Sequence, residues 1–233
     1  MAITTTRRSF LTWLSAGTTT AALIACDTSE PGGGGGAPDA AGGANGPDAG
    51  DPMNGPDAAP QPACVPTTPD ALGPFFEDGA PMRSKIAEDG EPGERLVMNG
   101  VVVADDCVTP VVGALLDVWQ ADAEGNYFDA GADYRLRGRM LSGADGRFQV
   151  DTIRPGNYAL SPGAWRPAHL HFIVAQAGFA PVTTQVYFAG DPFLPPNDGC
   201  TTCGSNDPAR IVELAGDAAQ GWTGELRIIL ART

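Results

Sequence analysis

His169 and His171 are the only histidines in the chain, and one residue separates them in the stretch RPAHLHF. On a β-strand, residues two apart point to the same face, about 7 Å apart along the strand, so the two imidazoles can converge on one side. Neutral imidazole is a common metal ligand, but a structural histidine pair explains this pattern equally well. The count excludes metal sites that need a third histidine.

Any metal bound by this pair must complete its shell with tyrosine, aspartate, glutamate, cysteine or water. The chain has four tyrosines. Tyr158 follows a Pro-Gly turn shortly before the histidines, and Tyr127 follows the stretch VWQADAEG. Phenolate oxygen is a hard anionic donor that suits Fe(III), and imidazole also binds iron. Tyr134 lies in the same stretch as Tyr127 and competes with it for this role.

Five segments follow one another along the domain: GPFF (73–76), GALLDVWQADAEGNY (113–127), GRFQVDTIRPGNY (146–158), WRPAHLHF (165–172) and TTQVYFAGDP (183–192). Taken together, they resemble the intradiol ring-cleavage dioxygenases, most closely the protocatechuate 3,4-dioxygenase type. The resemblance implies one non-haem Fe(III) per chain, bound by four side chains: Tyr127, Tyr158, His169 and His171. It further implies that Tyr158 and His171 are the axial pair. At the position where the family has a segment with tyrosines, this chain has GPFF. A phenol near the site is therefore missing, which bears on substrate preference more than on catalysis.

The same resemblance implies an enzyme that inserts both atoms of O2 into a catechol-type ring and forms a cis,cis-muconate-type diacid. Tyr158 is expected to leave the metal and accept a substrate proton. Arg166 is expected to stabilise negative charge on the ring, and Gln185 to orient a polar group near the oxygen or the substrate. The net charge of −14 argues against a nucleic-acid partner. The expected partners are therefore a catechol and O2, in a homo-oligomer or a monomer.

A non-catalytic interpretation competes for half of the domain. The segments 99–119 and 143–160 also resemble the small transthyretin-like sandwich modules of surface proteins, which act as spacers or binding modules. That alternative does not predict RPAHLHF or TTQVYFAGDP, and it gives Tyr127 no role. Iron content and visible colour discriminate between the two interpretations.

The elements that must position these residues read as short strands divided by turns. Seven segments are expected to be strands: 96–104, 113–121, 146–153, 154–160, 168–175, 183–189 and 224–231. Segments 168–175 and 183–189 are expected to pair as a hairpin, with Leu170 and Phe172 in the core. Trp119 and Phe148 are also expected in the core. Residues 121–140 are expected to be a long functional loop, and residues 209–214 a turn or two of helix. The pattern predicts an all-β fold, a β-sandwich of mainly antiparallel strands with long functional loops and little helix.

Residues 1–26 have the layout of an export signal. Arg7 and Arg8 precede an uncharged and largely apolar run that ends at Cys26 and is too short to span a bilayer. The arginine pair resembles a twin-arginine signal, and LIAC resembles a lipobox that lipidates Cys26. An ordinary signal peptide with an incidental Cys26 is the alternative. We expect export across the bacterial cytoplasmic membrane, giving a membrane-anchored lipoprotein or a periplasmic or extracellular protein.

The remaining chain divides into a linker and one domain. Residues 27–63 consist mainly of Gly, Pro, Ala and Asp and have no aromatic residue, which predicts a disordered, acidic tether. Residues 64–233 suffice for one domain with a core. They contain four cysteines, and an even count in an exported domain favours disulfides. Three connectivities are possible, of which Cys64–Cys107 with Cys200–Cys203 is favoured.

Overall fold

Eleven strands and one short 3-10 turn make up the regular structure of the described residues in this computed structural model. The structure describes residues 64–128 and 133–233. The predicted export signal (1–26), with Cys26, and the predicted tether (27–63) lie outside the described residues. Within the described ranges, the prediction of an all-β fold with little helix is confirmed.

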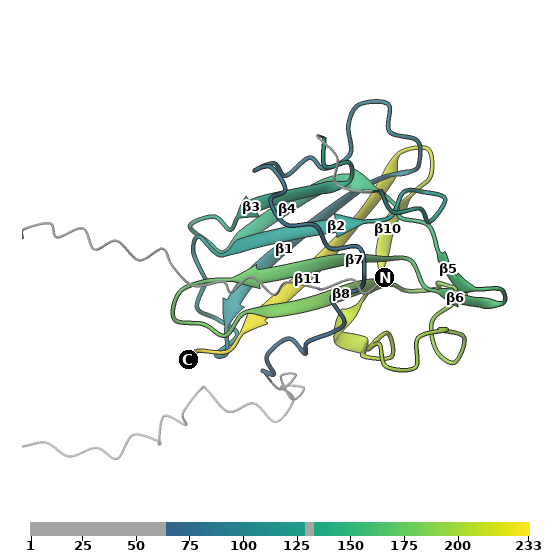
Figure 1. Cartoon of the computed structure of the whole chain (residues 1–233). Coiled ribbons are helices and arrows are strands. Elements are labelled where there is room, and N and C mark those ends of the chain that lie inside the picture. The colour runs from purple at the N-terminus through teal and green to yellow at the C-terminus, as the bar shows by residue number, and fades with distance from the viewer. Residues whose placement is uncertain (1–63, 129–132) are drawn as a thin grey trace, which may run out of the picture. The chain divides into compact units, whose positions relative to one another are not determined.

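The strands form two main sheets (Figure 1). The first has the order β10 (Leu214–Asp217), β11 (Gly221–Leu230), β1 (Arg95–Ala104), β4 (Arg147–Ile153). The second has the order β3 (Arg137–Leu141), β2 (Leu115–Gln120), β7 (His169–Ala175), β8 (Val182–Phe188), β9 (Ile211–Val212). Most neighbours are antiparallel, but β1 with β11 and β8 with β9 are parallel. A small hairpin, β5 (Tyr158–Ser161) and β6 (Ala164–Arg166), extends from the sandwich.

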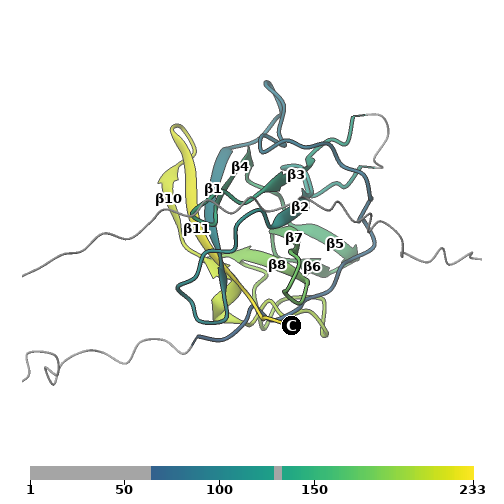
Figure 2. The ribbon, with the colours of Figure 1, turned by 90° about the vertical axis from the view of Figure 1, so that its left-hand side faces the viewer.

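The apolar core lies between the two sheets, which Figure 2 shows as two layers. Successive side chains on a strand point to opposite faces, so each strand gives every second residue to this core. Leu170 and Phe172 of β7 are fully buried in it, as predicted. The ring of Phe172 meets the ring of Phe148 from β4 at a centroid distance of 6.1 Å. This contact joins the two sheets.

Most predicted elements are present, with two differences. Each segment predicted as a strand overlaps one, and β7 and β8 form the predicted hairpin. Of the turn or two of helix predicted at 209–214, only the 3-10 turn Pro208–Arg210 is present, because the following residues form β9, which pairs with β8. Strand β3 begins inside the stretch predicted as a loop and ends one residue beyond it. Its arginines conceal it in the sequence, because Arg137 and Arg139 reach loop carbonyls instead of solvent.

Two disulfides fasten the domain, with the favoured connectivity. Cys64–Cys107 joins the first described residue to the turn that follows β1, and Cys200–Cys203 closes a short loop after β8. In the described ranges, no helix is both long and apolar enough to cross a membrane.

Candidate active site

The second sheet carries polar side chains on the face that points away from the core. Across β7 and β8, His169 lies opposite Tyr187 and His171 lies opposite Gln185. All four side chains are buried, with exposed fractions of 2% or less. Exposed polar residues are normal on the outer face of a sandwich, whereas buried ones need partners. Loops therefore enclose a polar layer on this face.

The two imidazoles point their Nε2 atoms toward each other. His169 Nδ1 lies 2.7 Å from the carbonyl oxygen of Pro167, which can only accept, so Nδ1 carries the proton and Nε2 carries a lone pair. The Nε2 atom of His169 lies 3.1 Å from Nε2 of His171 and 3.3 Å from the hydroxyl oxygen of Tyr127. Burial lowers the pKa of His169 to about 4 and the pKa of His171 well below its ordinary value. Both rings are thus neutral at neutral pH.

Tyr127, in the loop after β2, and Tyr158, at the start of β5, reach the histidines from two different segments. The two phenol rings are perpendicular, with centroids 5.6 Å apart, and the ring of Tyr158 lies 5.8 Å from that of His169. Burial raises the pKa of Tyr127. Tyr134, the alternative to Tyr127, donates its hydroxyl to the carbonyl of Asp78 at 3.1 Å. Of these two tyrosines, Tyr127 is the one that contacts His169.

Two glycines allow the loops that carry the tyrosines to touch. A Cβ at Gly125, which has a φ of +84°, would lie 2.1 Å from the carbonyl oxygen of Asn157. A Cβ at Gly156 would lie 2.3 Å from the carbonyl oxygen of Ala123. Both distances are far inside van der Waals contact, so only glycine fits at either position. The close approach fixes Tyr127 relative to Tyr158.

Asp191, in the turn after β8, ties the tyrosine and histidine segments together. One carboxylate oxygen accepts from Nδ2 of Asn157 at 2.7 Å and from the backbone N–H of Ala168 at 2.9 Å. These two residues directly precede Tyr158 and His169. Sequence reasoning placed Asp191 in a motif, AGDP, but gave it no function. Its contact with two distant segments has no local signal.

Aromatic rings wall the site. Phe75 stacks on Tyr127 with centroids 4.2 Å apart, and Trp119 stacks on His171 at 4.5 Å. Trp119 is buried, as predicted, yet it lies on the outer face of the sheet and not in the core between the sheets. Because the two rings lie flat against Tyr127 and His171, they restrict the rotation of these candidate metal ligands and exclude water from their faces.

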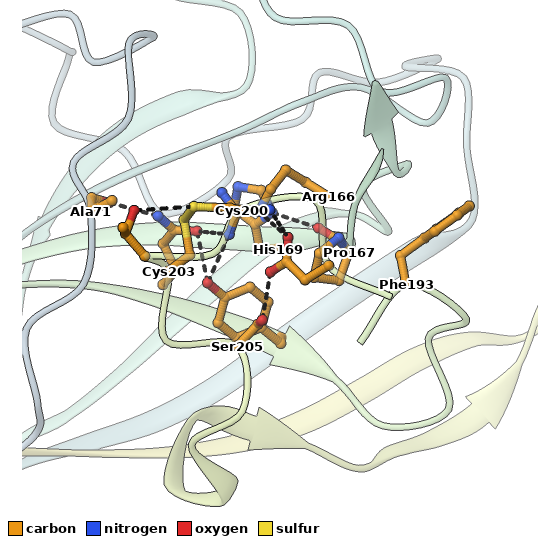
Figure 3. A network of polar contacts seen from close by, with 12 residues as sticks. Ala71, Arg166, Pro167, His169, Phe193, Cys200, Cys203 and Ser205 are labelled. Carbon is orange, nitrogen blue, oxygen red and sulfur yellow. Dashed lines mark hydrogen bonds and ion pairs between the residues drawn. A yellow bond between two sulfur atoms is a disulfide. The ribbon is translucent and has the colours of Figure 1, made fainter. Parts of the chain in front are cut away.

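Arg166 places a buried cation next to this cluster. Its Nη2 donates to the side-chain oxygen of Gln185 at 2.8 Å and to the hydroxyl of Tyr187 at 2.9 Å (Figure 3). Its Nε lies 3.0 Å from Oδ1 of Asp198, a residue that sequence reasoning missed. Burial lowers the pKa of the guanidinium, but interactions with neighbours that include Asp198 and Tyr158 outweigh this effect and raise it. The group is a fixed positive charge.

The donor set fits a ferric ion. The Nε2 lone pair of His169 faces a second imidazole nitrogen and a phenol oxygen in a buried space, and Nδ1 of His171 is buried without a hydrogen-bond partner. Neutral imidazoles and hard phenol oxygens are ligands that suit Fe(III). In the part of the chain that the structure describes, no three His, Cys, Asp or Glu side chains form a metal cluster. The phenol oxygen of Tyr127, 3.3 Å from Nε2 of His169, is thus a candidate protein donor beside the two imidazoles.

Known proteins resemble this chain in sequence and in fold. A family model described as Dioxygenase matches residues 72–219. A chlorocatechol 1,2-dioxygenase of Rhodococcus opacus is 35% identical over 173 residues, which cover 64% of this chain and 66% of the relative. A protocatechuate 3,4-dioxygenase beta chain of Burkholderia cepacia is 40% identical over 135 residues, with coverages of 53% and 56%. The chain thus spans less than two thirds of the length of these curated relatives.

A solved structure of a dioxygenase domain also aligns with this chain. The dioxygenase domain of a dioxygenase carbohydrate-binding protein fusion from Streptomyces sp. SirexAA-E aligns with a TM-score of 0.61 at 34% identity, covering 72% of this chain and 100% of that domain. The family match contains all six residues singled out in the sequence: Tyr127, Tyr158, Arg166, His169, His171 and Gln185. It extends well beyond the half of the domain that resembles transthyretin-like modules. This chain belongs to the intradiol ring-cleavage dioxygenase family.

Proposed function

We propose that this protein is a non-haem Fe(III) dioxygenase that cleaves a catechol-type ring between its two hydroxyl-bearing carbons. Both atoms of O2 enter the product, a cis,cis-muconate-type diacid, so the overall reaction needs no further reductant. The observation that carries the proposal is the buried convergence of two neutral imidazoles and two phenol side chains beside a fixed cation. The names of the relatives, which include catechol, chlorocatechol and protocatechuate dioxygenases, support a catechol-type substrate.

Four side chains would hold the ion: Tyr127, Tyr158, His169 and His171. When bound, Fe(III) supplies a Lewis acid that binds catechol oxygens and makes the ring reactive toward O2. The hydrogen bond from His169 Nδ1 to the backbone fixes the tautomer that leaves Nε2 free to bind a metal. Trp119, stacked on His171, holds that ring in its plane.

Tyr158 is the residue that we propose accepts a substrate proton. It is half-buried at the start of β5, whereas Tyr127 is held under the ring of Phe75. Tyr158 also lies directly opposite Arg166 across the β5–β6 hairpin, and the interaction with Tyr158 contributes to the raised pKa of that arginine, a cation that stabilises negative charge nearby. A phenolate in this position is poised to take a proton from a catechol hydroxyl.

Arg166 is proposed to stabilise the charge of the doubly deprotonated substrate. A preorganised cation in a site that excludes water acts more strongly than one in solvent. Gln185 is engaged at both ends, because its oxygen accepts from Arg166 and its Nε2 donates to the carbonyl of Ala71 at 2.6 Å. We therefore assign Gln185 the task of orienting Arg166, and through it the substrate.

We further propose that the protein acts outside the cytoplasm as an exported, lipid-anchored protein. The arginine pair before the apolar run and the LIAC stretch support this proposal, and two disulfides suit an oxidising compartment. Metabolic labelling with a fatty acid should mark the wild-type chain in a bacterial host. A Cys26→Ser variant should lose the label, and equal labelling of both would contradict lipidation at Cys26.

The visible spectrum and oxygen uptake test the proposed function. The iron-loaded protein should absorb in the visible through tyrosinate-to-iron charge transfer and should consume O2 with at least one of catechol, protocatechuate, chlorocatechol and hydroxyquinol. Tyr158→Phe should change the spectrum and slow product formation, whereas the matched control Tyr134→Phe should preserve both. A colourless protein that binds no iron, or one that consumes no O2 with any catechol, would contradict the proposal.

A further inference from the structure

The buried cation Arg166 is held from two sides, and one side comes from a loop outside the sheets. Gln185 and Tyr187 on β8 accept from its Nη2. On the other side, its Nε lies 3.0 Å from Oδ1 of Asp198, and the side chains of this pair are only 4% and 2% exposed. A buried cation needs a partner charge to offset the loss of water, and Asp198 supplies one.

The loop that carries Asp198 is attached to the strand that carries Arg166. The backbone N–H of Gly199 donates to the carbonyl of Trp165 at 2.7 Å, and Trp165 directly precedes Arg166. At the far end of the loop, the backbone N–H of Gly204 lies 3.2 Å from the carboxylate of Asp70, which also accepts from the hydroxyl of Tyr187 at 2.8 Å. Both ends of the loop are therefore anchored to the rest of the site.

The Cys200–Cys203 disulfide closes this loop next to the carboxylate (Figure 3). Oδ1 of Asp198 accepts from the backbone N–H of Cys200 at 2.8 Å, and Oδ2 accepts from the hydroxyl of Ser205 at 2.5 Å. The disulfide joins Cys200, the first of these donors, to Cys203, which lies two residues before Ser205. It thus directly limits the movement of one group that orients the carboxylate and shortens the free chain that leads to the other.

We propose that Asp198 is a positioning residue for ring cleavage: it fixes Arg166, and the Cys200–Cys203 disulfide fixes Asp198. The proposal rests on the proposed function, because it assigns Arg166 a role in turnover. Asp198 acts through the guanidinium and not on the substrate. Its effect should therefore appear in kcat, where charge develops on the ring, more than in KM.

A double-mutant cycle in turnover tests the coupling of Asp198 to Arg166. Asp198→Asn retains the acceptor for Cys200 but removes the charge, and a misplaced catalytic group can cost about 100-fold in rate. We expect Asp198→Asn to lower kcat about 10- to 100-fold and Arg166→Gln about 100- to 1000-fold. The double variant should be no slower than Arg166→Gln, because residues that act as one unit are not additive. Wild-type kcat in Asp198→Asn, or effects that multiply in the double variant, would overturn the proposal.

A second cycle uses the metal-free protein and needs no turnover. Asp198→Ala leaves a buried cation without its partner and should lower the thermal unfolding midpoint by about 5 °C or more. Adding Arg166→Gln should recover part of that loss, because it removes the unpaired charge. Additive losses would overturn the coupling. If wild-type protein cleaves no catechol, the proposed function fails, while this cycle still reports on Asp198 and Arg166.

The two disulfides provide a matched pair for the second half of the proposal. Cys200→Ser/Cys203→Ser should lower kcat about 10-fold and change the unfolding midpoint little, because the disulfide closes a very short loop. The control Cys64→Ser/Cys107→Ser opens a much longer loop and should lower the midpoint more while preserving kcat. Wild-type kcat in Cys200→Ser/Cys203→Ser, or an equal loss of kcat in both variants, would overturn the role of the Cys200–Cys203 disulfide.

Discussion

The two sheets of the sandwich share one core but differ on their outer faces. On β11 of the first sheet, buried residues alternate with exposed ones such as Thr223, Glu225 and Arg227. On β7 of the second sheet, four consecutive residues from His169 to Phe172 are buried. The inner faces of both strands pack into the same apolar core.

The difference shows where the molecule places its chemistry. On a strand with one solvated face, the residues of that face are polar, and water satisfies their hydrogen-bonding groups. On β7 and β8 the outer face is covered by the loops that carry Tyr127 and Asp198 and by the start of β5 with Tyr158, so polar groups there must satisfy each other. A strand buried on both faces but polar on one of them is the mark of the site.

The largest expected effect comes from the outer face of β7. His171→Ala removes a proposed iron ligand and should lower kcat/KM more than about 1000-fold, which corresponds to several kcal/mol of lost stabilisation. The metal-free variant should still fold, because the core side of the strand is unchanged. Iron content and turnover measure the first effect, and thermal unfolding measures the second. Turnover near that of the wild type would break the distinction between the two faces.

The inner face of the same strand should show the opposite pattern. Phe172→Ala leaves a cavity where the ring meets Phe148 and should lower the free energy of unfolding by about 3–5 kcal/mol. The fraction that remains folded should bind iron as the wild type does. Denaturant titration followed by iron analysis checks both. Unchanged stability with lost iron binding would contradict the assignment of Phe172 to the core.

A smaller effect is expected at Asp191, which links the segments that carry Tyr158 and His169. Asp191→Ala removes the acceptor shared by Asn157 and Ala168, so the proposed ligands Tyr158 and His169 lose a support. Loss of a group that orients metal ligands typically costs 10- to 100-fold in affinity, and we expect a change of about that size. Competition with an iron chelator measures it. Wild-type affinity would show that the backbone alone holds these segments.

The smallest effect should come from the solvated face of the first sheet. Glu225 on β11 is exposed and accepts a hydrogen bond from Asn99 at 3.1 Å. Glu225→Gln retains an acceptor and should change the free energy of unfolding by less than about 0.5 kcal/mol, with iron binding and turnover unchanged. A large loss of either property would mean that this face also serves the site.

Much of the fold can be predicted from the sequence, because strands are recognised by alternating apolar residues and by the turn residues that bound them. The segments that became β7 and β8 were predictable for that reason, and their register follows once they pair. Strand β3 was not, because its arginines suggest a solvated loop while they actually reach carbonyl groups.

The site also contains residues that the sequence indicates and residues that it does not. Tyr127, Tyr158 and the two histidines stand out by residue type and by their resemblance to a family. Asp191 and Asp198 do not, because their partners are brought to them by loop closure across the domain and no periodicity links them. A short clue exists for Asp198, which lies two residues before the CTTC stretch whose disulfide restrains its loop.

Isotope labelling of the product tests the central proposal most directly. The iron-loaded protein is supplied with catechol under ¹⁸O2, and the diacid is analysed by mass spectrometry. Intradiol cleavage with both atoms of O2 predicts a cis,cis-muconate that has gained two ¹⁸O atoms, aside from exchange of its carboxylate oxygens with water. A product that contains one ¹⁸O atom before exchange, a product cleaved outside the two hydroxyl-bearing carbons, or no ring cleavage at all would contradict it.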